Sequence, residues 1–285
     1  MNGFSSAWLH LREPADHRAR NRKLLAALGR VFADRRHVNV IDLGCGTGSN
    51  LRALASHLPH RQCWRLIDHD PALLAAGHAR LLDWADRAEM SDRNVVLTKG
   101  GRELTTTLAE GDLGAGVEEA LGSESDLVTA AALFDLVSAH WIARFASAVA
   151  ARRAVFYAAL VYDGVQTWHP PDPRDEAVLA AFHAHQAGDK GFGSAAGPGA
   201  ANALAEAFSA AGYEVSTGAS PWRLGAEQKH LVRALARHVA AAVRETGRMP
   251  DGDVIAWRAA RENAASCTIG HADLLALPPA RRYPT

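Results

Sequence analysis

Short, nearly continuous runs of apolar residues recur along the chain, each bounded by glycine, proline or polar residues. Such runs are typical of buried strands. The third expected sheet strand is the second arm of a hairpin, because Gly100-Gly101 separates the β-forming residues 94–98 from residues 103–109. The seven expected sheet strands are residues 38–43, 63–67, 103–109, 126–131, 154–162, 213–217 and 267–272.

Between these runs the apolar residues recur at helical spacing, which predicts amphipathic helices. Pro71 suits the first turn of one of them. The expected helices are residues 14–32, 49–58, 71–88, 137–150, 176–186, 200–211, 227–246 and 254–264. Apolar strands that alternate with helices indicate a sheet covered on both faces, so we expect a three-layer α/β/α sandwich with a mostly parallel, seven-stranded sheet.

The second half of the chain differs in amino-acid composition from the first. Residues 163–173 are rich in Pro, Trp and His and are expected to form a loop, and residues 188–199 are rich in glycine. No Pro- or Ser-rich linker separates the halves, and 285 residues are within the reach of one hydrophobic core, so we expect a single domain. Its parts are a helical cap (1–37), a core (38–162), an insertion with helical elaboration after the fifth strand (163–265), and a last strand with a tail (266–285).

Composition and charge narrow the function classes. The 31 basic residues balance 31 acidic ones, which removes the general attraction to a nucleic-acid backbone or an anionic membrane. The three cysteines lack paired spacing, so neither a disulfide framework nor a zinc site is indicated. The N-terminal residues lack the apolar run of a secretory signal, and no stretch approaches the ~18 apolar residues of a membrane span. We expect a cytoplasmic protein, a monomer or homodimer, with no membrane partner and with nucleic acid disfavoured.

The segment Asp42-Leu43-Gly44-Cys45-Gly46-Thr47-Gly48 follows the first expected strand. Glycines at alternate positions after a buried strand let the backbone turn tightly and admit a ligand where any Cβ would collide. Asp68 stands twenty residues past Gly48, at the end of the next strand. An α/β nucleotide site places a carboxylate there to accept hydrogen bonds from ribose hydroxyls. The two signals together predict a ligand that contains a nucleoside.

These residues resemble the class I S-adenosylmethionine-dependent methyltransferase family. The first motif of that family is an acidic residue, any residue, and then three alternating glycines, and its second motif is an acidic residue shortly before a helix-starting proline. The resemblance covers about residues 38–162, and it implies a Rossmann-like fold and methyl transfer from S-adenosylmethionine, with S-adenosylhomocysteine as product. The matching residues are Asp42, Gly44, Gly46 and Gly48 in the first motif and Asp68 and Pro71 in the second.

The resemblance also implies a set of cofactor-binding residues. Asp68 would bind the ribose, the glycine loop would line the methionine and ribose, and His69 would lie along the adenosine. Asp112 would approach the adenine amino group, although its sequence context is equally typical of a surface turn. The implied cofactor-binding residues are Asp42, Gly44, Cys45, Gly46, Gly48, Asp68, His69, Asp112, Leu113 and Ala130.

The methyl acceptor should lie beyond the carboxyl ends of the strands, where open α/β sheets bind ligands. Phe134 and Asp135 follow the fourth expected strand, and Tyr162 and Asp163 follow the fifth, so we expect all four to rim the transferred methyl group. Asp135 and Tyr162 are the candidate catalytic residues. Asp135 could orient or deprotonate an acceptor, or it could cap the following helix. An oxygen acceptor would need a base and an amine would not, and the sequence leaves both open.

Aromatic and ionisable residues of the insertion could form a lid or acceptor pocket, or could pack the insertion against the sheet. His183 and His185 would point to different faces of a helix, which is wrong for one metal ion, and we expect no metal site. Arg20, ahead of the first strand, could reach the methionine carboxylate. The residues of the insertion that raise these alternatives are Trp168, His169, His183, His185, Lys190 and Phe192.

The sequence favours methyl transfer to a small-molecule oxygen or nitrogen. A protein or RNA methyltransferase is one alternative, and a binding protein that holds the donor without catalysis is another. An NAD-dependent dehydrogenase is disfavoured because its G-x-G-x-x-G/A fingerprint would meet Ser49 at the third position, and because Asp42 would repel a pyrophosphate.

Overall fold

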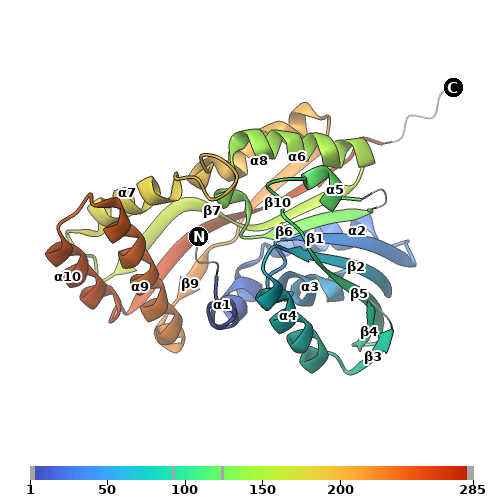
Figure 1. The fold of residues 1–285 in the computed structure, drawn as a ribbon, viewed down its shortest axis with the longest axis horizontal. Helices are drawn as coiled ribbons and strands as arrows, with labels where there is room; N and C mark the ends of the chain where they lie inside the picture. The colour runs from blue at the N-terminus through green and yellow to red at the C-terminus, as the bar shows by residue number, and fades with distance from the viewer. Residues whose placement is uncertain (1–3, 92–93, 123–124, 281–285) are drawn as a thin grey trace.

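The strands form one sheet with helices on both faces (Figure 1). The computed structural model describes residues 4–91, 94–122 and 125–280. The strands are β1 His37–Leu43, β2 Arg61–Asp68, β3 Arg87–Ser91, β4 Asn94–Lys99, β5 Arg102–Glu110, β6 Leu127–Ala131, β7 Val155–His169, β8 Glu214–Ala219, β9 Trp222–Leu224 and β10 Ser266–Leu277. The helices are α1 Ser6–Ala19, α2 Arg22–Val31, α3 Ser49–Leu54, α4 Pro71–Trp84, α5 Val117–Ala120, α6 Ala139–Arg152, α7 Asp175–Gln186, α8 Ala200–Ala210, α9 Lys229–Thr246 and α10 Asp251–Arg261.

The strand order is β3-β4-β5-β2-β1-β6-β7-β10-β8, and β9 pairs with β10. The strands from β5 to β7 pair in parallel. β10 is antiparallel to both β7 and β8, so β8 runs in the same direction as β7. The mostly parallel core of seven strands is confirmed, but over the described ranges the sheet has ten strands rather than seven. The additional strands are β3 and β4, which extend one edge, and β9.

Apolar side chains cover both faces of the sheet. Val38 and Val40 of β1 pack in the cluster beneath α2, α3 and α4, whereas Ile41 and Leu43 pack on the opposite face with α5, α6 and α8. A third cluster joins α1, α7, α9 and α10 to the distant parts of β7 and β10. The expected three layers are therefore present, with an additional helical lobe at one end (Figure 1).

The expected single helix over residues 14–32 is wrong, because two helices, α1 and α2, stand there. The break lies at Asn21, whose side-chain oxygen accepts hydrogen bonds from Lys23 N and Leu24 N at 3.1 and 3.2 Å and so caps α2. The backbone N–H of Asn21 donates to Asp273 Oδ2 at 2.8 Å. This contact with β10 ties the break to the sheet, and it depends on a residue distant in sequence.

The expected loop over residues 163–173 is wrong in its first part, since β7 continues to His169. β10 continues as well, and it pairs with β7 as far as Ser266 opposite His169. The pairing of β7 with β10 is irregular around Leu160. Leu160 has φ 57°, and its N–H donates to the buried carboxylate of Asp273 at 2.9 Å instead of completing the ladder. A shift in the pairing register between Ala272 and Leu274 accompanies this contact.

Other helix and strand positions agree with expectation to within a few residues. The helix that begins at Pro71 ends at Trp84, because residues 87–91 form the exposed edge strand β3. Trp222 is buried and lies in β9. No helix within the described ranges is both long and apolar enough to cross a membrane.

Candidate functional site

The glycine loop turns sharply after β1. Gly44, Gly46 and Gly48 have φ angles of 61°, 51° and 75°, a region that residues with a side chain rarely adopt. A Cβ at Gly46 would lie 2.9 Å from Leu9 Cδ1, so α1 lies directly over the loop. Every second position of the loop therefore requires glycine.

Charged side chains hold α1 in this position. Glu13 of α1 accepts a hydrogen bond from Arg52 Nε of α3 at 2.7 Å and from Arg80 Nη2 of α4 at 3.2 Å. These ion pairs hold the pKa of Glu13 below its usual value, although burial acts in the opposite direction. His17 of the same helix lies 3.0 Å from Ser49 Oγ. The N-terminal cap is thus fixed to both helices that follow the glycine loop and β2.

Asp68, at the end of β2, lies against the loop. Its Oδ2 accepts a hydrogen bond from Gly46 N–H at 2.7 Å, and its Oδ1 accepts one from Asp70 N–H at 3.0 Å. His69 points away, with 74% of its side chain exposed, although its Nδ1 is 3.4 Å from Asp68 Oδ1. The structure thus brings together the two sequence signals, the glycine loop and the carboxylate.

Asp42 is fully buried behind the loop. Asn50 Nδ2 donates to its Oδ1 at 2.7 Å, while its Oδ2 has no hydrogen-bond partner in the described part of the chain. Burial raises the pKa of Asp42 to about 7. Cys45, within the loop itself, is also buried.

The positive charge of Arg20 lowers the pKa of Asp42, against the larger effect of burial. Arg20 is only 4% exposed, and its Nε and Nη1 form no hydrogen bond to any described residue. A buried guanidinium and a buried carboxylate thus each retain an unsatisfied hydrogen-bonding atom. Such groups are costly unless a partner satisfies them.

The residues expected around the adenosine lie at the same edge of the sheet. Gly111 N–H donates to Asp68 O at 3.0 Å, which brings the end of β5 to the end of β2. Asp112 is exposed, and its Oδ1 accepts a hydrogen bond from Gly114 N–H at 2.8 Å within its own turn. Leu113 is buried, and Ala130 is buried in β6 opposite Leu43.

Phe134 and Asp135 form a short 3-10 turn after β6. The expectation that Phe134 rims the site is wrong: it is fully buried, with its ring centroid 5.2 Å from that of Phe145. Asp135 does not cap the following helix either, because Ser138 Oγ accepts the hydrogen bond from Trp141 N–H. Asp135 is 8% exposed, its Oδ1 lacks a partner within residues 4–91, 94–122 and 125–280, and burial raises its pKa to about 6.

Tyr162 lies beyond the parallel part of β7 and is buried. Its hydroxyl is 3.0 Å from His183 Nε2 of α7, and Gln166 Nε2 donates to it at 3.1 Å. Burial raises the pKa of Tyr162 strongly. Asp163 is exposed and accepts a hydrogen bond from Val165 N–H at 3.0 Å, which does not place it at the rim.

Sequence reasoning missed His271 beside Tyr162 and, with it, the neighbouring Trp222 and Arg12. His271 of β10 faces Tyr162, with ring centroids 6.3 Å apart, and Trp222 lies 5.2 Å from His271 on another side. The guanidinium of Arg12 lies over Trp222 at 4.9 Å. His271 Nδ1 has no partner in the described part of the chain, and burial lowers its pKa to about 3. No sequence signal joins these residues, since they come from α1, β9 and β10.

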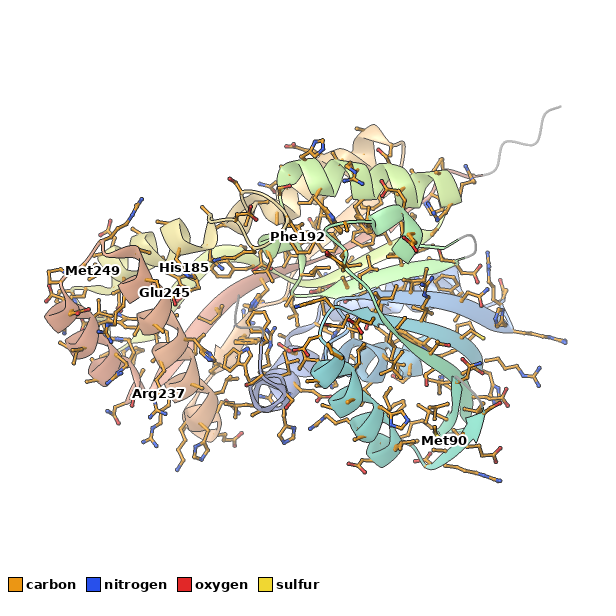
Figure 2. All side chains as sticks on the ribbon, in the orientation of Figure 1. Met90, His185, Phe192, Arg237, Glu245 and Met249 are labelled. Atoms are coloured by element: carbon orange, nitrogen blue, oxygen red, sulfur yellow. The ribbon has the colours of Figure 1, made fainter. Side chains whose placement is uncertain are left out.

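The remaining aromatic and histidine residues of the insertion mostly pack or lie at the surface. Trp168 packs on Trp257 at 5.6 Å, and Phe192 packs on Trp141 at 5.6 Å. His185 points outward to Glu245, with Nε2 2.9 Å from its carboxylate (Figure 2). His183 and His185 thus make separate contacts. Among the residues described, no three His, Cys, Asp or Glu side chains are grouped to hold a metal ion.

No family model matches the chain, and no curated protein matches its sequence. Its fold is similar to that of a cyclopropane synthase from Mycobacterium tuberculosis, with a TM-score of 0.50 at 11% identity over 96% of this chain and 94% of that one. A SAM-dependent methyltransferase from Thiobacillus denitrificans, in complex with S-adenosyl-L-homocysteine, matches with a TM-score of 0.46 at 17% identity over 98% and 99% of the two chains. Magnesium protoporphyrin IX methyltransferase from Synechocystis, with bound SAM, matches at 0.44 and 12% identity over 77% and 80%. The likeness to the synthase confirms the expected Rossmann-like fold class.

Proposed function

We propose that this chain is a methyltransferase that uses S-adenosylmethionine, releases S-adenosylhomocysteine, and methylates an oxygen or nitrogen of a small molecule. The observation that carries this proposal is the pair of unsatisfied buried charges at Arg20 and Asp42, beside a loop of three glycines with positive φ. The methionine end of the donor carries a carboxylate and an ammonium group. A buried guanidinium and a buried carboxylate complement these two charges.

In this proposal Asp68 and the glycine loop bind the rest of the donor. Asp68 accepts one backbone N–H on each carboxylate oxygen, and each oxygen keeps a lone pair for a ribose hydroxyl. Asp42 binds the ammonium group, and Gly44, Gly46 and Gly48 admit the donor next to the backbone. The other donor-binding residues of this proposal are Cys45, His69, Asp112, Leu113 and Ala130.

The donor supplies a methyl group already activated by a sulfonium, so the protein has chiefly to align the acceptor with it. Asp135 follows β6, and Tyr162 lies within β7 beyond its parallel pairing with β6, at the edge of the sheet that carries the glycine loop; we assign both to the acceptor. The insertion supplies His183 next to Tyr162 and Trp222 next to His271, which supports one domain in which residues 163–265 shape the acceptor side. A small acceptor suits these enclosed groups better than a protein or RNA chain.

A dehydrogenase is less compatible with this site. A dinucleotide would bring its pyrophosphate to the loop, next to the carboxylates of Asp42 and Asp68, which would repel it. A protein that binds the donor without catalysis would share the donor site, but it has no need of buried, unsatisfied groups at Asp135 and His271.

Thermal unfolding with added ligand tests the proposal. A ligand at 100 times its Kd adds about 2.7 kcal/mol to the free energy of unfolding. S-adenosylhomocysteine should therefore raise the Tm of the wild type, and NAD should not. Arg20→Met should remove most of the shift, whereas Arg18→Met, at a nearby exposed arginine of α1, should leave it unchanged. A shift with NAD alone would contradict the proposal.

A further inference from the structure

The hydrogen bonds at Tyr162 have a direction. Gln166 donates an amide hydrogen to the Tyr162 oxygen at 3.1 Å and occupies one of its lone pairs. The hydroxyl hydrogen of Tyr162 is then available to His183 Nε2, 3.0 Å away. In that arrangement His183 carries its own proton on Nδ1, and one lone pair of the Tyr162 oxygen remains free.

Two other buried polar atoms of the candidate site are unsatisfied. Asp135 Oδ1 and His271 Nδ1 lack partners among residues 4–91, 94–122 and 125–280. The ring of His271 lies 6.3 Å from that of Tyr162. Trp222 lies 5.2 Å from His271 on another side, and the guanidinium of Arg12 lies over Trp222 at 4.9 Å. The ionised carboxylate oxygen of Asp135 only accepts, so a ligand that satisfies it brings a hydrogen-bond donor.

We propose that Tyr162 and His183 form a proton relay that serves a hydroxyl acceptor, with Gln166 fixing its direction. This inference rests on the proposed methyltransferase function. The acceptor O–H donates to the free lone pair of Tyr162, and Tyr162 donates to His183 Nε2. As the acceptor oxygen forms its bond to the methyl carbon, the electrons of the carbon–sulfur bond pass to sulfur. The acceptor proton moves to Tyr162, and the proton of Tyr162 moves to His183, which becomes an imidazolium.

The surroundings of Tyr162 favour a proton relay over a tyrosine that is already ionised before the substrate binds. Burial and the charges of Asp163 and Asp135 raise the pKa of Tyr162, so its hydroxyl stays protonated until it can pass a proton on. His183 is only half-buried, and the proton that it receives can leave to solvent. A neutral amine needs no such transfer before attack, so the relay specifies a hydroxyl acceptor rather than an amine. Tyr162 is the catalytic residue, and His183 and Gln166 act through it.

The tautomer of His183 tests the relay without any substrate. Nitrogen-15 NMR of histidine-labelled protein, with His183→Gln to assign the signal, should show Nε2 of His183 unprotonated and Nδ1 protonated. Tyr162→Phe removes the donor and should shift the Nε2 signal. A purely structural histidine in the opposite tautomer would carry its proton on Nε2, and that result would overturn the relay.

Turnover tests the acceptor class. We would measure S-adenosylhomocysteine release with a panel of small phenols and alcohols beside a panel of matched amines. Release with hydroxyl compounds should fall about 100-fold or more in Tyr162→Phe and in His183→Gln, since a positioned base contributes at least this factor. His185→Asn, on the same helix but paired with Glu245 at the surface, should behave as wild type. Release with amines alone, or full release by His183→Gln, would overturn the inference.

Binding of S-adenosylhomocysteine distinguishes a failure of the relay from a failure of the proposed methyltransferase function. Tyr162→Phe and His183→Gln lie outside the proposed donor site and should bind S-adenosylhomocysteine as the wild type does. If the wild type itself fails to bind, the proposed function fails. If all three proteins bind and the variants keep full turnover, only the relay fails.

Discussion

The carboxylate of Asp68 accepts a hydrogen bond from the backbone N–H of Gly46 at 2.7 Å, across 22 residues of sequence. The N–H of Asp70 holds the other carboxylate oxygen at 3.0 Å. The loop after β1 and the carboxylate after β2 are therefore one preformed unit. A preformed site loses less conformational entropy when its ligand binds.

Gly46→Ala should disrupt this unit. Gly46 has φ 51°, and an added Cβ would lie 2.9 Å from Leu9 Cδ1. The backbone strain alone costs roughly 1–2 kcal/mol, and displacement of α1 or of the loop should weaken adenosyl-ligand binding at least about tenfold. Urea unfolding and calorimetric titration measure the two effects.

The matched control is Gly101→Ala. Gly101 has φ 77° in the β4–β5 turn, and nothing lies within 4 Å of an added Cβ. It should show a similar backbone cost with unchanged affinity. If Gly46→Ala bound as tightly as this control, α1 and the loop would not define the ligand site.

Asp273→Ala should be among the most destabilising single changes. This fully buried carboxylate accepts hydrogen bonds from Leu160 N–H at 2.9 Å, Tyr157 Oη at 2.8 Å and Asn21 N–H at 2.8 Å. Its removal leaves three donors without their acceptor, which costs roughly 3 kcal/mol or more. Urea unfolding measures this loss.

A surface carboxylate gives the comparison for Asp273. Asp86 is exposed and pairs with Lys99 at 2.8 Å, and solvent screens such a pair, so Asp86→Ala should leave the free energy of unfolding nearly unchanged. Equal effects of the two substitutions would show that Asp273 does not hold the irregular β7–β10 junction together.

Asp42→Asn should change how stability depends on pH. Burial raises the pKa of Asp42 from 3.8 to about 7, so between these values the folded protein binds a proton that the unfolded chain does not. The stability from this group is complete below about pH 4 and is lost as the pH rises to about 7. Asp135, whose pKa is raised to about 6, acts with the same sign.

Urea unfolding of wild type and Asp42→Asn at pH 5 and pH 8 checks this prediction. The wild type should lose more stability than the variant between the two values, because the asparagine amide of the variant does not ionise in either state. Asp83→Asn, at an exposed position of α4, should follow the wild type. If Asp42→Asn followed the wild type as closely, that result would contradict a raised pKa at Asp42.

The parallel core could be predicted because its signals are local. A short apolar run before Gly44 predicts β1, and Pro71 predicts the start of α4, and both are confirmed. The break at Asn21 and the extension of β7 to His169 depend on contacts with β10, which is distant in sequence from both. Sequence periodicity carries no information about such partners.

Local sequence signals likewise predict some of the site residues, whereas the placement of others depends on distant contacts. Gly46 and Asp68 meet because adjacent parallel strands bring their carboxyl ends together, which the spacing of motifs predicts. Phe134 and Asp135 are neighbours in sequence, yet in the 3-10 turn Phe134 packs in the aromatic core while Asp135 keeps an unsatisfied oxygen. His271 joins the site only through the pairing of β10 with β7, and no spacing in the sequence indicates it.

Calorimetric titration of the purified protein with S-adenosylmethionine and S-adenosylhomocysteine, with NAD as control, tests the central claim most directly. The account predicts micromolar binding of both adenosyl ligands, a loss of about 2 kcal/mol or more in Asp68→Ala, and no loss in Asp83→Ala. Binding of NAD without binding of either adenosyl ligand would contradict the methyltransferase account.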